Sequence, residues 1–162
     1  MCILTALPSY AQNAVHYYFK TMDIRNGLSQ NTVYQILQDR KGFMWFGTKD
    51  GLNRYDGLSY RVYKKENSGL GKNFITALYE DHEGNIWIGT DGGVFIYNPV
   101  LDSFTAFNQT SDKGTVIKDF VTMIGSDEYD NIWISVENQG LFCYNHEKRL
   151  RNYLHDLSLI HI

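Results

Sequence analysis

The sequence has little cysteine and proline and no long apolar run, and two of these shortages exclude a class of protein. Cys2 and Cys143 are the only cysteines among 162 residues, so the chain lacks the disulfide framework that holds small secreted domains together. No stretch approaches the ~20 consecutive apolar residues that a membrane-spanning helix needs. The residues therefore predict neither a disulfide scaffold nor a transmembrane helix.

Positive charge is also sparse. Lysine and arginine number 15 against 18 acidic residues, which gives a formal net charge of −3. Because there is no basic stripe or arginine-rich run, we expect no contact with nucleic acid. The histidines show no ligand spacing, so we expect no metal site, and no motif suggests a cofactor. The histidines are His16, His82, His146, His155 and His161.

Aromatic residues make up 15% of the chain, and three of them mark a repeat. Trp45, Trp87 and Trp133 lie 42 and 46 residues apart. Their surroundings read QDRKGFMWFGTKDGLNRYDG, EDHEGNIWIGTDGGVFIYNP and SDEYDNIWISVENQGLFCYNH. A period in the forties with one tryptophan per copy is typical of β-propeller blades.

The copies share an aspartate, turn glycines, the tryptophan, a small residue after it and a tyrosine. A one-residue insertion between Ser135 and Gly140 accounts for the shifted end of the third copy. The structural repeat positions are Asp39, Gly42, Trp45, Gly47, Gly51 and Tyr55, then Asp81, Gly84, Trp87, Gly89, Gly93 and Tyr97, then Asp127, Trp133, Gly140 and Tyr144.

Each copy contains four short apolar runs bounded by turn residues, which predicts four strands per blade. We expect first strands near Thr32–Gln38, Ile75–Glu80 and Val121–Gly125, and second strands at Phe43–Thr48, Asn85–Thr90 and Asn131–Val136. Third strands are expected at Leu52–Tyr55, Val94–Tyr97 and Leu141–Tyr144, and fourth strands at Tyr60–Lys64, Phe104–Asn108 and Leu150–Leu154. The apolar triplet around each tryptophan indicates a strand covered on both faces. The predicted fold is all-β, a partial propeller of about three antiparallel blades.

Because the tryptophans and aspartates recur in every copy, we expect them to have structural roles. A tryptophan in an apolar triplet is expected in the core, although it could also stack on a sugar. An aspartate before a turn is expected to accept backbone N–H bonds, although it could also be a catalytic carboxylate. We therefore nominate no catalytic residue, and the ligand-binding residues are unknown.

The two ends of the chain depart from the repeat. Met1–Ala11 resembles a truncated signal peptide, and Leu157–Ile162 resembles a translated sequencing adapter. His16–Lys20 is similar to the fourth strands and would complete the last blade of a closed ring. The expected divisions are 1–11 signal, 12–26 lead-in with the ring-closing strand, 27–68, 69–114 and 115–156 for the three blades, and 157–162 adapter.

Gly27–Gly57 closely resembles the two-component regulator propeller repeat, with good resemblance over Gly71–Phe107 and weaker resemblance over Phe120–Tyr153. The resemblance implies the periplasmic sensor region of an inner-membrane hybrid histidine kinase of Bacteroidetes. Such proteins sense oligosaccharides and regulate glycan-utilisation genes through a phosphorelay. The resemblance thus implies an oligosaccharide ligand, further blades, a homodimer in the full-length protein, and kinase activity outside these residues.

Two alternatives remain open at this stage. The chain could be part of a secreted propeller glycosidase or lyase, but the sialidase Asp box has one residue fewer between its aspartate and glycine than Asp39 and Asp81 have. We also find no pair of carboxylates suited to glycoside hydrolysis, so we do not expect this stretch to be an enzyme. The other alternative is a protein-interaction propeller.

Overall fold

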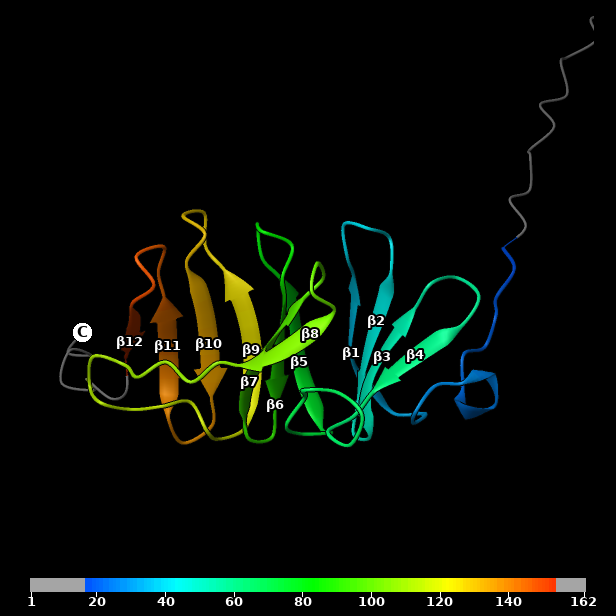
Figure 1. Ribbon diagram of the computed structural model, residues 1–162, viewed down its shortest axis with the longest axis horizontal. Coiled ribbons are helices and arrows are strands. Elements are labelled where there is room, and N and C mark those ends of the chain that lie inside the picture. The colour runs from blue at the N-terminus through cyan, green and yellow to red at the C-terminus, as the bar shows by residue number, and fades with distance from the viewer. Residues whose placement is uncertain (1–16, 154–162) are drawn as a thin grey trace, which may run out of the picture.

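The computed structural model describes residues 17–153, which fold into three four-stranded sheets standing side by side (Figure 1). The first sheet contains β1 (Val33–Gln38), β2 (Met44–Thr48), β3 (Gly51–Tyr55) and β4 (Tyr60–Tyr63). The second contains β5 (Ile75–Glu80), β6 (Ile86–Thr90), β7 (Gly93–Asn98) and β8 (Ser103–Ala106). The third contains β9 (Val121–Ser126), β10 (Ile132–Val136), β11 (Gly140–Tyr144) and β12 (Leu150–Asn152).

Every sheet is an antiparallel meander in chain order, so the all-β fold with three propeller blades is confirmed. The strand bounds differ from the expected ones by two residues or fewer. The fourth strands end early: β8 stops at Ala106, the last residue paired with β7. Among residues 17–153 the single helix is the short η1 (Ile24–Asn26), and no helix there could cross a membrane.

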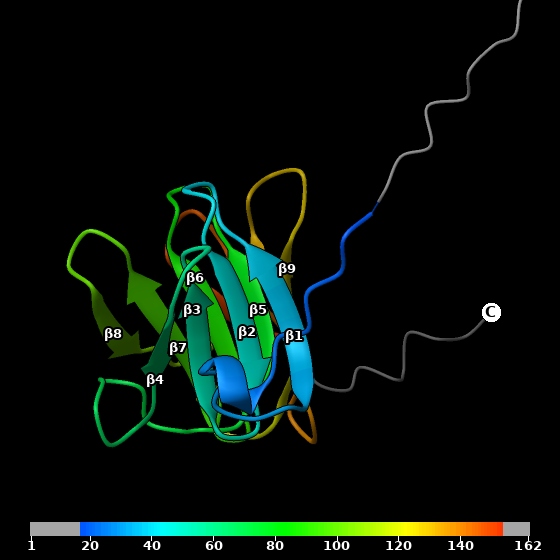
Figure 2. The ribbon, with the colours of Figure 1, turned by 90° about the vertical axis from the view of Figure 1, so that its right-hand side faces the viewer.

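The blades pack through their sheet faces, with β1, β5 and β9 next to one another (Figure 2). Trp45 lies between the first two blades at 1% exposure, and Trp87 lies between the second and third at 3%. All five residues of β6 are buried, as expected for a strand covered on both faces.

The third blade departs from that expectation. Residues of β10 alternate between buried and half-buried, and Trp133 is only half-buried. The reason is physical, because among the described residues no fourth sheet covers the face on which Trp133 lies. The core assignment therefore applies to Trp45 and Trp87 and only in part to Trp133.

The expected ring-closing strand is not paired in this structure. Residues 17–20 form no strand, and Tyr18 and Phe19 are both 95% exposed. Since that strand was expected to complete a blade other than these three, its pairing stays a prediction. The expected signal and adapter segments, 1–11 and 157–162, lie outside the described residues.

Candidate ligand-binding face

The recurring aspartates lie in the turn between the first and second strands of each blade. Asp39 Oδ1 accepts the backbone N–H groups of Lys41 and Phe43, at 3.0 and 2.9 Å. Its Oδ2 accepts the Nε1–H of Trp45 at 2.8 Å. One carboxylate thus holds both the turn and the indole, because each of its two oxygens accepts from a different group.

The same contacts recur in the other blades. Asp81 and Asp127 accept the indole N–H of Trp87 and Trp133 at 2.8 and 2.9 Å. In the third blade the Asn131 side chain, followed by the Trp133 indole, lowers the pKa of Asp127 to about 2. The three carboxylates are on separate blades and each is fully engaged, so they form no catalytic pair.

The recurring glycines serve two purposes. Gly42 and Gly84 close the aspartate turns at φ of 88° and 84°, a conformation that Asp130 adopts at 59° in the third copy. Gly47 and Gly89 instead permit close approach of the next blade. Gly51, Gly93 and Gly140 begin the third strands with positive φ, and Tyr55, Tyr97 and Tyr144 lie near the ends of these strands.

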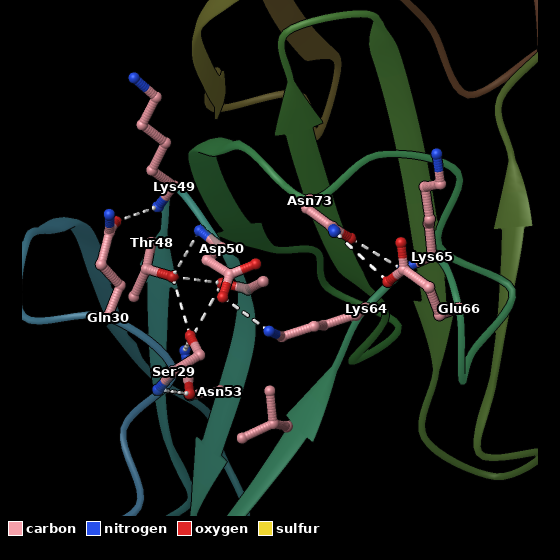
Figure 3. Close-up of polar contacts among 12 residues, drawn as sticks. Ser29, Gln30, Thr48, Lys49, Asp50, Asn53, Lys64, Lys65, Glu66 and Asn73 are labelled. Atoms are coloured by element: carbon pink, nitrogen blue, oxygen red, sulfur yellow. Dashed lines mark hydrogen bonds and ion pairs between the residues drawn. The ribbon is translucent and has the colours of Figure 1, made fainter. Parts of the chain in front are cut away.

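The opposite edge of the blades carries the β2–β3 turn and the β4–β5 loop, and a polar network fixes them (Figure 3). Thr48 Oγ1 lies 2.9 Å from Ser29 Oγ and donates to the carbonyl of Gly51 at 2.9 Å. Lys64 Nζ lies 2.6 Å from Asp50 Oδ2. The turn is therefore held both by Ser29, which precedes β1, and by the loop to the second blade.

Next to this network a row of aromatic rings crosses all three blades. Tyr34, on β1, packs against Phe74 with ring centroids 4.8 Å apart. Phe74 in turn meets Phe120 edge to face at 5.6 Å. Tyr34 is 46% exposed, and the two phenylalanines are partly exposed. We call Tyr34, Phe74 and Phe120 the aromatic row.

Polar groups border the aromatic row. The Nζ of Lys49 lies 5.8 Å from the centre of the Phe74 ring, and the Lys49 backbone N–H donates to Gln30 Oε1 at 3.1 Å. Partly exposed rings beside amide and ammonium donors form a surface that can hold a ligand with both apolar and hydroxyl-bearing faces.

Sequence reasoning overlooked the aromatic row, although a signal was present. Phe74 and Phe120 each stand thirteen residues before a tryptophan, directly before a first strand. The first copy has Thr32 at that position, and Tyr34 reaches the row from two residues further along. The break in the repeat hid the relationship, because only the packing of the first two blades brings Tyr34 to Phe74.

Comparison with known proteins agrees with the propeller fold described above. The family described as two component regulator propeller matches residues 27–50 and 69–92. Histidine kinase P4 of Formosa agariphila is 42% identical over 59 residues, which are 36% of this chain and 4% of that protein.

Two solved structures from B. thetaiotaomicron are similar to this chain. The extracellular domain of the hybrid two component system BT3049 has 29% identity and a TM-score of 0.72 over 83% of this chain and 20% of its own. The extracellular domain of BT4673, described as a one component system, has 29% identity and a TM-score of 0.68 over 78% of this chain and 18% of its own. This chain thus spans a fifth or less of these solved chains. Residues 27–50 and 69–92, in the first and second blades, therefore match two-component regulator propeller repeats, and the three-bladed fold is similar to that of an extracellular domain of a hybrid two component system.

Proposed function

We propose that this chain contributes to a periplasmic sensor propeller that binds an oligosaccharide at the aromatic row. The observation that carries the proposal is the continuous contact of Tyr34, Phe74 and Phe120 across three blades. Pyranose rings present C–H faces that pack on aromatic rings, and their hydroxyl groups seek donors and acceptors at the rim. Lys49 supplies such a group next to Phe74, and Gln30 holds the backbone of Lys49.

Similarity to extracellular domains of hybrid two component systems supports a sensing role. In the proposal, the parent protein carries further blades, an inner-membrane anchor and a histidine kinase, and it acts as a homodimer that controls glycan-utilisation genes. Ligand would shift the population of two ectodomain states, which requires different affinity for each state. The blades themselves would perform no chemistry.

A screen of the chain against an oligosaccharide library tests the proposal, with thermal shift as the first readout and calorimetry on any hit. Tyr34→Ala should weaken binding of a hit about tenfold, which corresponds to the loss of one aromatic contact. Tyr34 is suitable because it is 46% exposed, so its removal leaves the blade core intact.

Tyr129→Ala is the matched control. Tyr129 is a 71% exposed tyrosine in the β9–β10 turn, at the opposite edge of the blades. Equal affinity of the two variants for the hit, or hydrolysis of the library in place of binding, would rule out this assignment.

A further inference from the structure

The two junctions between blades contain equivalent aromatic cages. At the first junction Trp45 contacts Tyr97 of the next blade with centroids 5.0 Å apart, and Tyr63 at 6.0 Å. At the second junction Trp87 contacts Tyr144 of the next blade at 5.8 Å and Phe107 at 5.1 Å. The repeat thus places a tryptophan, a ring at the end of the fourth strand or directly after it, and a tyrosine together twice.

At the first junction the chain fills this space with its own cation. Arg54 is the cross-strand neighbour of Trp45. Its guanidinium carbon lies 4.7 Å from the centre of the Phe43 ring and 5.7 Å from that of Trp45. Its Nη1 donates to the hydroxyl of Tyr97 at 2.9 Å. Asp102 Oδ1 lies 3.9 Å from the same Nη1 and accepts from the Tyr97 hydroxyl at 2.7 Å. The guanidinium is thus held by ring faces, one hydroxyl acceptor and a carboxylate.

At the second junction the same space is a pocket of about 290 Å³. The cross-strand neighbour of Trp87 is Ile96, which has no polar group, and Asn85 stands where the first blade has Phe43. Trp87, Ile96 and Tyr144 line the pocket. The tryptophan and the tyrosine of the next blade are therefore kept as pocket walls, while the guanidinium is missing.

The charges at this pocket favour a positive occupant. Three carboxylates, those of Asp81, Glu83 and Asp130, line it against one lysine, Lys148. Glu83 stands where the first blade has Lys41, so an acid replaces a base at the junction that lacks the arginine. The remaining titratable lining residues are Tyr144, His146 and His82, whose Nδ1 lies 4.0 Å from Asp130 Oδ1.

Tyr144 occupies the repeat position of Tyr97, whose hydroxyl accepts a hydrogen bond from Arg54. Burial raises the pKa of the Tyr144 hydroxyl, and the nearby Glu83 raises it further. The hydroxyl therefore stays protonated, and its oxygen can accept a hydrogen bond from a cationic N–H group, as that of Tyr97 does from Arg54.

We propose that the pocket between the second and third blades binds a small organic cation through a guanidinium group, with Trp87 and Tyr144 as its aromatic walls and Glu83 as its acidic partner. Arg54 at the neighbouring junction is the internal precedent for this ligand. The site is separate from the aromatic row and does not depend on the oligosaccharide proposal.

Amide spectra of the ¹⁵N-labelled full chain test the proposal, because each junction has its own indole N–H signal. Ethylguanidinium should shift the Trp87 indole signal saturably, with a Kd on the order of millimolar. Trp45, whose junction is filled, should not respond. Ethylurea has nearly the same shape without the charge, and it should bind about tenfold more weakly or not at all.

Two reciprocal variants sharpen the test. Ile96→Arg supplies the missing guanidinium from the chain, so it should abolish the response of Trp87. Arg54→Ile empties the first junction, so the Trp45 signal should begin to respond. If Arg54→Ile does not fold, Ile96→Arg and Glu83→Gln test the proposal instead. Glu83→Gln should lower the affinity for ethylguanidinium by about threefold or more. A Trp87 signal that ignores ethylguanidinium, follows ethylurea equally, or still responds in Ile96→Arg would overturn the proposal.

Discussion

The indole N–H of Trp45 donates to Asp39 Oδ2 at 2.8 Å, across the turn that joins β1 to β2. Both residues are buried, at 1% and 9% exposure. The contact joins local structure to packing, because the carboxylate that closes the turn also orients the ring that fills the space between two blades.

Removing this carboxylate should destabilise the chain. Asp39→Ala deletes a charged acceptor and leaves the Trp45 indole N–H buried without its partner. We expect a loss of about 2–3 kcal/mol in the free energy of unfolding, measured by urea denaturation. Asp56→Ala is the control, because exposed Asp56 accepts only within its own turn, from Leu58 and Ser59. Its cost should stay within about 1 kcal/mol, and equal costs for both variants would contradict the joint role of Asp39.

The tryptophans should differ in their contribution to stability. Trp87→Ala empties a site that is 3% exposed, so we expect a loss of about 3–5 kcal/mol. Trp133 is half-buried, and Trp133→Ala should cost about 2 kcal/mol or less. Thermal or denaturant unfolding of both variants measures the difference. A loss below about 1 kcal/mol for Trp87→Ala would show that the ring is not a core residue.

The glycine two residues after the tryptophan should not tolerate a methyl group. A Cβ on Gly89 would lie 2.7 Å from Val121 Cγ1, on the next blade, and 2.9 Å from Ala77 Cβ. Gly89→Ala should therefore cost about 1–3 kcal/mol through overpacking.

Gly125→Ala is the matched control in a strand. A Cβ on Gly125 meets no atom within 4 Å, so this change should stay within about 0.5 kcal/mol of wild type. Chemical denaturation of the two variants compares them directly, and a neutral Gly89→Ala would mean that the blades separate easily at this point.

Acid should weaken the third blade through Asp127. Its pKa is lowered from 3.8 to about 2, chiefly by the Asn131 side chain and then by the Trp133 indole. A depressed folded-state pKa stabilises the fold above the ordinary pKa, and this stabilisation is lost as pH falls toward 2. The melting temperature of wild type should therefore exceed that of Asp127→Asn at neutral pH, and the gap should shrink between about pH 4 and pH 2. A gap that does not change with pH would exclude this linkage.

Much of the architecture could be predicted because it is local in sequence. The spacing of Trp45, Trp87 and Trp133 locates the blades, and the turn residues around Asp39 bound the strands to within two residues. Hydrogen bonds between neighbouring strands of a meander link residues close in the chain, so short patterns suffice to find them.

Short sequence patterns do not predict the contacts between blades. Nothing in the repeat indicates that Gly47 faces Ile75, that Trp133 is half-exposed, or that Tyr34 reaches Phe74. Each relationship joins residues of different blades or depends on whether a neighbouring sheet is present.

The sequence by itself determined an all-β chain of three propeller blades, because the repeat period, the turn residues and the tryptophan motif are all local in sequence. Only the tertiary structure decided where a ligand could bind. The aromatic row and the pocket beside Trp87 arise where faces of successive sheets meet. At that pocket Ile96 replaces the arginine of the first blade, Asn85 replaces Phe43 and Glu83 replaces Lys41, and only packing brings these side chains together.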